Sequence, residues 1–293
     1  MQQPEIKVGL AGHGIGKSRT PFMHLEAAKA LNINYRYEII DAMNHDLKLD
    51  EIIYRAETNG FKGLNITYPF KREALAFADE LSEDSRKIGA INTLVFSEGK
   101  RYGYNTDYIG FSKAYRKISL GRKSNNILLI GTGGAGAAIS NAIVVAGADR
   151  LALYDVDPDS AETLRKRTNG HFATDRVVVA KDISREIEFA DGIVNASTAG
   201  MDTHPGIPID PVLLEKRHWV FDIIYFPIET MLLKSARRKG CFTVNGADMA
   251  VYQAIYAFEL FTGIKPDYES MRNAFNSFDI GGKALRKENM IDN

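Results

Sequence analysis

The sequence has little cysteine. Cys241 is the one cysteine among 293 residues, which excludes an internal disulfide and a metal site built from several thiolates. Disulfides belong mainly to secreted and other oxidising compartments. We therefore expect a cytoplasmic protein.

Net charge and long apolar runs are also absent. Lysine plus arginine and aspartate plus glutamate number 37 each, so no basic excess is available to attract nucleic acid or an acidic membrane surface. The first residues carry no signal-peptide pattern, and no apolar run approaches the length that spans a bilayer. We expect neither nucleic acid nor a membrane among the partners.

Histidines are few and scattered. The six histidines form no cluster with metal-ligand spacing. His13 and His24 are interpreted as local structural groups, and no metal site is expected.

The chain does contain enough residues for two domains, with an ordinary globular composition of 45% hydrophobic and 25% charged residues. Its first hundred residues alternate predicted strands and helices, which indicates an α/β layer. The expected strands are 6–11, 35–40 and 64–68, the expected helices are 21–31 and 47–59, and residues 91–104 are predicted to form a hairpin.

The stretch GLNITYPFKR at 63–72 alternates as a strand does. Leu64, Ile66 and Tyr68 would form its apolar face. Asn65 and Thr67 would then share the polar face. An antiparallel strand with one face in solvent would also explain this pattern.

A second alternation of predicted strands and helices follows the polar connector at 120–125. A buried strand at 126–130 leads into GTGGAG at 131–136 and then into a helix, and further strands are expected at 150–154, 177–180, 192–195, 220–224 and 242–244. This context gives the G-x-G-x-x-G pattern its mechanism, because the glycines allow a tight turn and close approach to a pyrophosphate at the helix N-terminus. The predicted dinucleotide site comprises Gly131, Gly133, Gly134, Ala135 and Gly136.

Asp155 lies at the end of the next predicted strand, where it can accept hydrogen bonds from the adenosine ribose and would repel a ribose phosphate. Arg165, Lys166 and Arg167 follow on the next predicted helix, where they are interpreted as a solvated face. The residues therefore favour NAD over NADP as the cofactor.

Six motifs, in order, resemble those of the shikimate/quinate dehydrogenase family. They are SRTPFMH at 18–24, GLNITYPFK at 63–71, IGAINT at 88–93, YNTDYIGF at 104–111, FDIIYFPIET at 221–230 and GADMAVYQA at 246–254. The resemblance implies two α/β domains. The N-terminal one, residues 1–110 completed by 247–293, would bind the substrate, and residues 111–246 would form a Rossmann doubly wound parallel sheet that binds NAD.

The resemblance also implies roles for individual residues. Lys71 and Asp107 match the catalytic pair of the family, and Ser18 and Thr20 match the hydroxyls that hold the substrate carboxylate. Further residues match positions that contact ring hydroxyls or line the pocket, namely Asn65, Thr67, Asn92, Tyr225 and Gln253. On the cofactor side the matching residues are Asn195, Thr198 and Gly246.

This assignment suits the chemistry of alcohol oxidation by hydride transfer. A group must take the hydroxyl proton and return it in the reverse direction. Lys71 can do so if Asp107 orients its ammonium group and compensates its charge.

Two departures from the family pattern bear on the substrate and the cofactor loop. Biosynthetic shikimate dehydrogenases usually have serine in place of Thr20, and the loop NASTAGM at 195–201 lacks the proline often found after the Asn-x-Thr element of the family. The Ser-Arg-Thr-Pro form together with Asp155 resembles the NAD-dependent quinate/shikimate dehydrogenases of catabolism. The expected activity is the oxidation of quinate to 3-dehydroquinate and of shikimate to 3-dehydroshikimate, by a monomer or homodimer.

Three alternatives stay open at this point. The chain could be an NADP-dependent enzyme of aromatic amino acid biosynthesis, an aminoshikimate dehydrogenase of the same fold, or a catalytically silent NAD-binding sensor.

Overall fold

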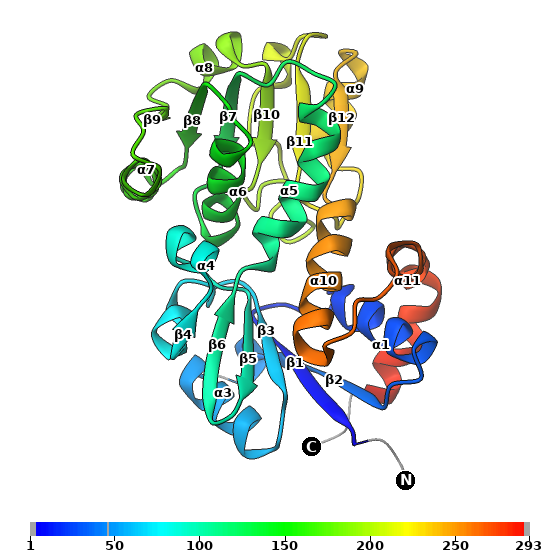
Figure 1. Ribbon diagram of the computed structural model, residues 1–293. Coiled ribbons are helices and arrows are strands. Elements are labelled where there is room, and N and C mark those ends of the chain that lie inside the picture. Colours follow the sequence, from blue (N-terminus) through cyan, green and yellow to red (C-terminus); the bar gives the residue numbers. More distant parts are fainter. Residues whose placement is uncertain (1–3, 46, 290–293) are drawn as a thin grey trace. The chain divides into compact units, whose positions relative to one another are not determined.

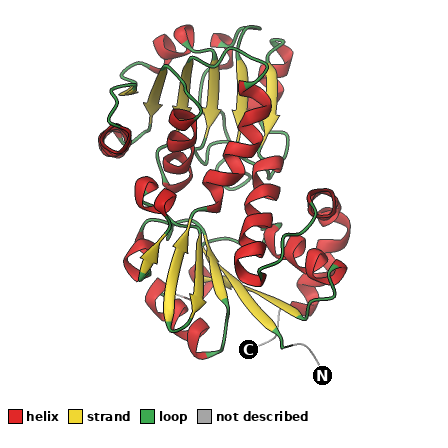
Figure 2. Ribbon diagram, viewed as in Figure 1, coloured by secondary structure: helices red, strands yellow, loops and turns green. Residues whose placement is uncertain are grey.

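The computed structural model describes residues 4–45 and 47–289. The chain forms two compact units, Met1–Thr106 with Val251–Asn293 and Asp107–Ala250, which we call the first and second units (Figure 1). Both units are α/β, as Figure 2 shows by colour. The α/β fold class predicted from the sequence is confirmed.

The first unit contains a six-stranded mixed sheet in the order β2-β1-β3-β5-β6-β4. Its strands are β1 (Ile6–Gly12), β2 (Tyr35–Asp41), β3 (Gly63–Ile66), β4 (Glu80–Leu81), β5 (Thr93–Ser97) and β6 (Lys100–Tyr104). β1 runs parallel to β2 and β3, whereas β5 is antiparallel to β3 and β6.

Helices cover both faces of this sheet. The helices of this unit are α1 (Thr20–Ala30), α2 (Ala42–His45), α3 (Leu49–Thr58), the 3-10 helix η1 (Glu73–Phe77), α4 (Glu83–Ile88), α10 (Ala247–Thr262) and α11 (Tyr268–Asn289). α3 packs its apolar residues against Leu64 and Ile66 on one face, while Ala257 and Phe261 of α10 pack with Val8 and Val95 on the other. α11 packs against α1.

β3 shows why the sequence pattern was only partly informative. Leu64 and Ile66 are buried as predicted, but Tyr68 lies beyond the strand and is 66% exposed, so its assignment to the apolar face was wrong. Asn65 is itself buried, because β3 lies between β1 and β5 with helices on both faces. The polar face of this strand is therefore not a solvated face.

The hairpin between β5 and β6 turns through Glu98 and Gly99, whose φ angles are 53° and 72°. Positive φ at both central residues is the geometry that matches the twist of the flanking strands. α1 begins at Thr20, one residue before its expected start, and no side chain caps it. The last helix, α11, continues to Asn289.

The second unit contains a six-stranded parallel sheet in the order β12-β11-β10-β7-β8-β9. Its strands are β7 (Asn126–Ile130), β8 (Arg150–Tyr154), β9 (Val177–Val179), β10 (Gly192–Asn195), β11 (Trp219–Asp222) and β12 (Phe242–Asn245). Its helices are α5 (Thr106–Ser119), α6 (Gly134–Val145), α7 (Pro158–Phe172), α8 (Ile183–Phe189), η2 (Pro211–Leu213) and α9 (Met231–Arg238). This strand order is that of the Rossmann fold, with the order reversing between β7 and β10.

Candidate active site

Three predicted substrate residues meet at the start of α1. The Ser18 hydroxyl accepts a hydrogen bond from the Thr20 amide at 3.3 Å, and the Thr20 hydroxyl accepts one from the Gln253 side-chain amide at 3.3 Å. Gln253 belongs to α10, 233 residues further along the chain. The fold of the first unit thus gathers two hydroxyls and an amide into one polar group.

Arg19, between the two hydroxyl residues, points elsewhere. Its guanidinium donates to the Phe275 carbonyl at 2.7 Å and lies 4.6 Å from the Phe275 ring centroid. The side chain is only 2% exposed. Arg19 therefore ties the turn that carries Ser18 and Thr20 to α11.

A second polar group lies on β3 and β5. Asn65 and Thr93 are directly opposed in the two strands, and the Asn65 amide donates to the Thr93 hydroxyl at 3.1 Å. Asn92 accepts a hydrogen bond from the Thr106 backbone amide at 2.7 Å. The predicted asparagines, Asn65 and Asn92, are both 4% exposed and are joined through Thr93.

The loop after β3 carries Thr67 and Lys71. The Thr67 amide donates to the Ala11 carbonyl at 2.9 Å, the Tyr68–Pro69 peptide bond is cis, and the Phe70 side chain is buried. The Lys71 carbonyl accepts a hydrogen bond from the Ile91 amide at 2.8 Å. The backbone of Lys71 is thereby anchored next to the segment that carries Asn92, and Asp107 directly follows Thr106, the partner of Asn92.

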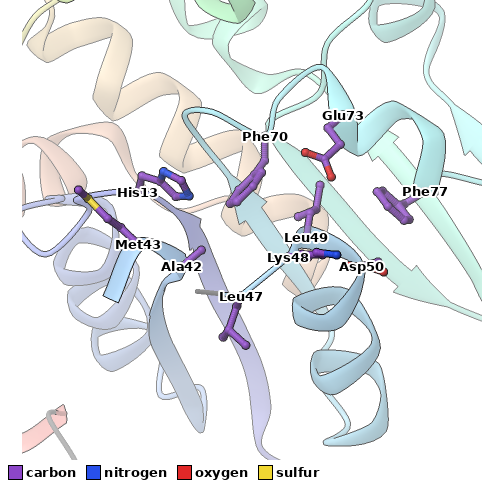
Figure 3. A pocket seen from close by; sticks show the side chains of 10 residues that line it. All are labelled: His13, Ala42, Met43, Leu47, Lys48, Leu49, Asp50, Phe70, Glu73 and Phe77. Carbon is purple, nitrogen blue, oxygen red and sulfur yellow. The ribbon is translucent and has the colours of Figure 1, made fainter. Parts of the chain in front are cut away.

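A pocket of about 570 Å³ opens beside the same loop (Figure 3). The rings of His13 and Phe70 meet edge to face within it, with centroids 5.1 Å apart. None of the residues predicted to bind the substrate is among its ten lining residues. This pocket is distinct from the two polar groups described above.

The glycine turn of the second unit leaves room for a dinucleotide. A Cβ at Gly136 would lie 2.0 Å from the Gly131 carbonyl oxygen, and Gly131 itself has a φ of 94°, so both positions require glycine. A Cβ at Gly133 would meet nothing within 4 Å, so the turn presents bare backbone to open space. Gly134 and Ala135 begin α6, and no side chain caps this helix end, which suits it to an anionic pyrophosphate.

Asp155 holds this turn in place. Its carboxylate accepts hydrogen bonds from the Thr132 backbone amide at 2.6 Å and from the Thr132 hydroxyl at 2.8 Å. Its other oxygen accepts from the Asp157 amide at 3.0 Å. A carboxylate has about four acceptor positions, so Asp155 keeps capacity for a further donor.

A buried network shapes the loops after β10 and β11. The Asn195 side chain donates to the Asp222 carboxylate at 3.0 Å and to the Ala199 carbonyl at 3.2 Å, and its oxygen accepts from the Ser197 amide. The Asp222 carboxylate also accepts from the Thr230 hydroxyl at 2.7 Å and from the backbone amide of Ile224. The amide of Asn195 is thus used to fold the loop that exposes Thr198.

Asp222 makes the stability of the protein depend on pH. Burial raises the pKa of its carboxyl from 3.8 to about 6, against the opposing effect of its three hydrogen-bond donors. A raised carboxyl pKa stabilises the folded state fully below pH 3.8, and this contribution is lost as pH rises through 6. The loss is on the order of 3 kcal/mol.

Replacing Asp222 by asparagine removes this titration. The free energy of unfolding of Asp222→Asn, minus that of the wild type, is therefore expected to rise by about 3 kcal/mol between about pH 4 and about pH 7. Urea unfolding at a series of pH values measures it, with Asp175→Asn, at an exposed position of the same unit, as the matched control. If this difference in the free energy of unfolding does not change with pH, the raised pKa of Asp222 is contradicted.

The other two predicted residues lie near this network. Tyr225 is half-buried, in the loop after β11. A Cβ at Gly246 would lie 1.9 Å from the Ile223 carbonyl oxygen, so glycine is required where α10 starts beside this loop.

Thr93 and Asp222 were not among the predicted site residues. Thr93 is the first residue of β5 and Asp222 is the last residue of β11, and both are fully buried. Each lies inside a family motif quoted above. A polar side chain in a fully buried strand was the available signal, because such groups need hydrogen-bond partners.

The described part of the chain has neither a membrane-spanning helix nor a cluster of metal-binding side chains. Residues 4–45 and 47–289 include no helix long and apolar enough to cross a bilayer. Within the same residues, no group of three or more histidine, cysteine, aspartate or glutamate side chains is placed to hold a metal ion.

Comparison with known proteins places this geometry in a family. Residues 10–94 match the model of the shikimate dehydrogenase substrate binding domain, and residues 246–274 match that of the shikimate 5'-dehydrogenase C-terminal domain. These segments carry both polar groups of the first unit except Thr106.

Relatives match over nearly the whole chain. A quinate/shikimate dehydrogenase (NAD(+)) of Corynebacterium efficiens is 39% identical over 94% of this chain and 100% of its own. A shikimate dehydrogenase (NADP(+)) of Pseudarthrobacter chlorophenolicus is 42% identical over 92% of this chain and 93% of its own. The structure of quinate dehydrogenase from Corynebacterium glutamicum in complex with NAD is 39% identical, covers 94% of this chain and 100% of its own, and superposes with a TM-score of 0.87. With its two α/β units, its glycine turn and these relatives, the chain belongs to the shikimate/quinate dehydrogenases, a family of oxidoreductases that use a nicotinamide dinucleotide.

Proposed function

We propose that this protein is an NAD-dependent dehydrogenase that interconverts quinate with 3-dehydroquinate and shikimate with 3-dehydroshikimate. The main observation in favour of NAD over NADP is the position of the Asp155 carboxylate, which lies at the end of β8 beside the glycine turn. The relatives are named for either NAD(+) or NADP(+), so the choice for this chain depends on its own residues.

The turn after β8 is acidic. Asp155, Asp157 and Asp159 occur within five residues, and no lysine or arginine lies between them. An uncharged ribose can donate hydroxyl hydrogens to a carboxylate, whereas a ribose phosphate would be repelled. Arg165 is engaged by Glu162 on the same helix, with N–O distances of 2.7 Å. These charges favour NAD.

The substrate carboxylate would be bound at the Ser18 and Thr20 hydroxyls, beside Gln253. Arg19 donates to Phe275 instead, so this end would be held by neutral donors. Quinate carries an extra hydroxyl on the carbon that bears its carboxylate. The change from serine to Thr20 at this end supports acceptance of quinate as well as shikimate.

Lys71 and Asp107 would carry out the proton transfer. The Lys71 amine takes the proton of the reacting hydroxyl during oxidation and returns it during reduction, while the Asp107 carboxylate orients and neutralises the resulting ammonium group. A bound NAD supplies the hydride acceptor. Asn65, Thr67, Asn92 and Tyr225 would hold the ring, and Asn195, Thr198 and Gly246 would shape the nicotinamide side.

Steady-state turnover of the purified protein tests the proposal, with quinate and shikimate each offered alongside NAD or NADP. We expect faster NAD reduction than NADP reduction, and comparable turnover of quinate and shikimate. Activity confined to shikimate and NADP would assign a biosynthetic enzyme and overturn the interpretation of Asp155 and Thr20. Faster turnover of an amino analogue would favour an aminoshikimate dehydrogenase. Tight binding of NAD without turnover of any of these acids would indicate a sensor.

Asp155→Asn isolates the charge at the ribose position. Asparagine keeps an acceptor for the Thr132 amide but removes the negative charge, so the ratio of kcat/KM for NAD to that for NADP is expected to fall about 10- to 100-fold, equivalent to about 1.4 to 3 kcal/mol. The same ratio should be unchanged in Asp175→Asn. If Asp155→Asn keeps the wild-type ratio, another group discriminates between the cofactors.

A further inference from the structure

Thr93 lies between Asn65 and Asn92, the two asparagines predicted to bind the substrate. Its hydroxyl is 3.1 Å from the Asn65 Nδ2 atom and 3.1 Å from the Asn92 Oδ1 atom. The residue is fully buried, so no water competes for these hydrogen bonds. One hydroxyl therefore connects both amides.

The direction of each hydrogen bond in this group is fixed by one group that can only donate, the Thr106 backbone N–H. The Thr106 backbone N–H lies 2.7 Å from the Asn92 side chain and can only donate, so it faces the Oδ1 atom of Asn92. The Thr93 hydroxyl has a single hydrogen, which it donates to the same oxygen. Its lone pairs then face Asn65, which must present its NH₂ group.

Tyr37 completes the chain from the other side. Its hydroxyl donates to the Asn65 Oδ1 atom at 2.8 Å, which is consistent with the orientation that Thr93 requires. The order of donors is thus Tyr37 to Asn65, Asn65 to Thr93, and Thr93 to Asn92. Reversing one amide would place two donors or two acceptors against each other.

This order decides what the amides can offer a ligand. Each NH₂ group has two hydrogens. That of Asn65 gives one to Thr93, and that of Asn92 gives one to the Thr106 hydroxyl at 2.9 Å. Each amide thus has one further N–H, which suits an acceptor such as a ring hydroxyl oxygen.

We propose that Thr93 is a positioning residue that sets both Asn65 and Asn92 to donate to ring hydroxyl oxygens of the substrate, without touching the substrate itself. The inference rests on the proposed function, because it assumes a polyhydroxylated ring acid. It extends that function, because Thr93 lies behind the two amides and would determine how they bind the non-reacting hydroxyls.

Thr93→Val removes the shared hydroxyl at nearly constant size. With shikimate, kcat/KM is expected to fall about 10- to 100-fold, the effect of unpaired buried polar groups. KM for the dinucleotide should change less than about twofold, and Thr93→Ser, which keeps the hydroxyl, should recover most of the loss. Thr168→Val is the matched control, since Thr168 is also fully buried and its hydroxyl lies 3.2 Å from that of Ser140 in the second unit.

Analogues of shikimate that lack one of the two non-reacting hydroxyls separate positioning from general destabilisation. The wild type should discriminate strongly against these analogues, and Thr93→Val should lose much of that discrimination. Tyr37→Phe, which removes only the donor to Asn65, should weaken discrimination against one analogue and keep it against the other. This variant provides a test even if Thr93→Val does not fold.

Wild-type kcat/KM in Thr93→Val, or an equal loss for shikimate and both analogues, would overturn the proposal. In Tyr37→Phe, unchanged discrimination against both analogues would do the same. Failure of the proposed function is recognised separately, because the wild type would then turn over neither quinate nor shikimate.

Discussion

Replacing Lys71 by alanine is expected to lower kcat by about a hundredfold to ten-thousandfold, the range for loss of a general acid or base. The fold should be retained, because the backbone at this position is anchored through its carbonyl to Ile91 and the neighbouring Phe70 fills the apolar side of the loop. Steady-state turnover with quinate and NAD measures the loss, and the thermal unfolding midpoint reports the fold.

Two further variants make this test specific. Lys71→Arg keeps the positive charge but cannot release a proton at neutral pH, so it should bind substrate and remain nearly inactive. Lys100→Met is the matched control, because Lys100 is an exposed lysine of the same unit paired with Glu80, and it should keep kcat within about twofold. Near-normal turnover in Lys71→Ala would reject proton transfer by Lys71.

The second large effect concerns the glycine turn. Gly133 has a φ of −65° and a ψ of −164°, which alanine also adopts, and a Cβ there meets no protein atom within 4 Å. Gly133→Ala is therefore expected to leave the unfolding midpoint nearly unchanged. Its methyl group would occupy the space where the pyrophosphate approaches, and Kd for NAD should rise about 10- to 100-fold through loss of charge-assisted hydrogen bonds.

Two other glycines provide the comparison. Gly170 lies within α7 with open space around its Cβ position, so Gly170→Ala should bind NAD normally and be slightly more stable. Gly136→Ala would place its Cβ against the Gly131 carbonyl and should destabilise the second unit itself. Calorimetric titration with NAD and thermal unfolding distinguish these outcomes. Normal NAD binding by Gly133→Ala would show that the dinucleotide does not approach this turn.

The local elements were predictable because they depend on short-range patterns. Short apolar runs identified β1 and β2, alternating apolar residues identified β3, and a buried strand followed by glycines identified β7 and α6. Boundaries were less predictable. Tyr68 continued the alternation in sequence but lies outside β3, and α1 begins at Thr20, one residue before its expected start.

Hydrogen-bond partners far apart in sequence were not predictable. Tyr37 and Asn65 are 28 residues apart, and Asn195 and Asp222 are 27 apart. Such pairs depend on strand order and register, whereas periodicity reveals only which face a residue occupies. The role of Asn195 in folding its own loop could not be predicted from the sequence NASTAGM for the same reason.

The sequence by itself determined the α/β class, the glycine turn and, through six motifs in order, the family. Only the tertiary structure decided the mixed strand order of the first unit, the hydrogen bond between Gln253 and Thr20, and the orientation of Asn65 and Asn92. The physical reason is that an amide is oriented by the donors and acceptors that surround it. In this protein those partners come from β2, β5 and the start of α5, which the sheet of the first unit brings together.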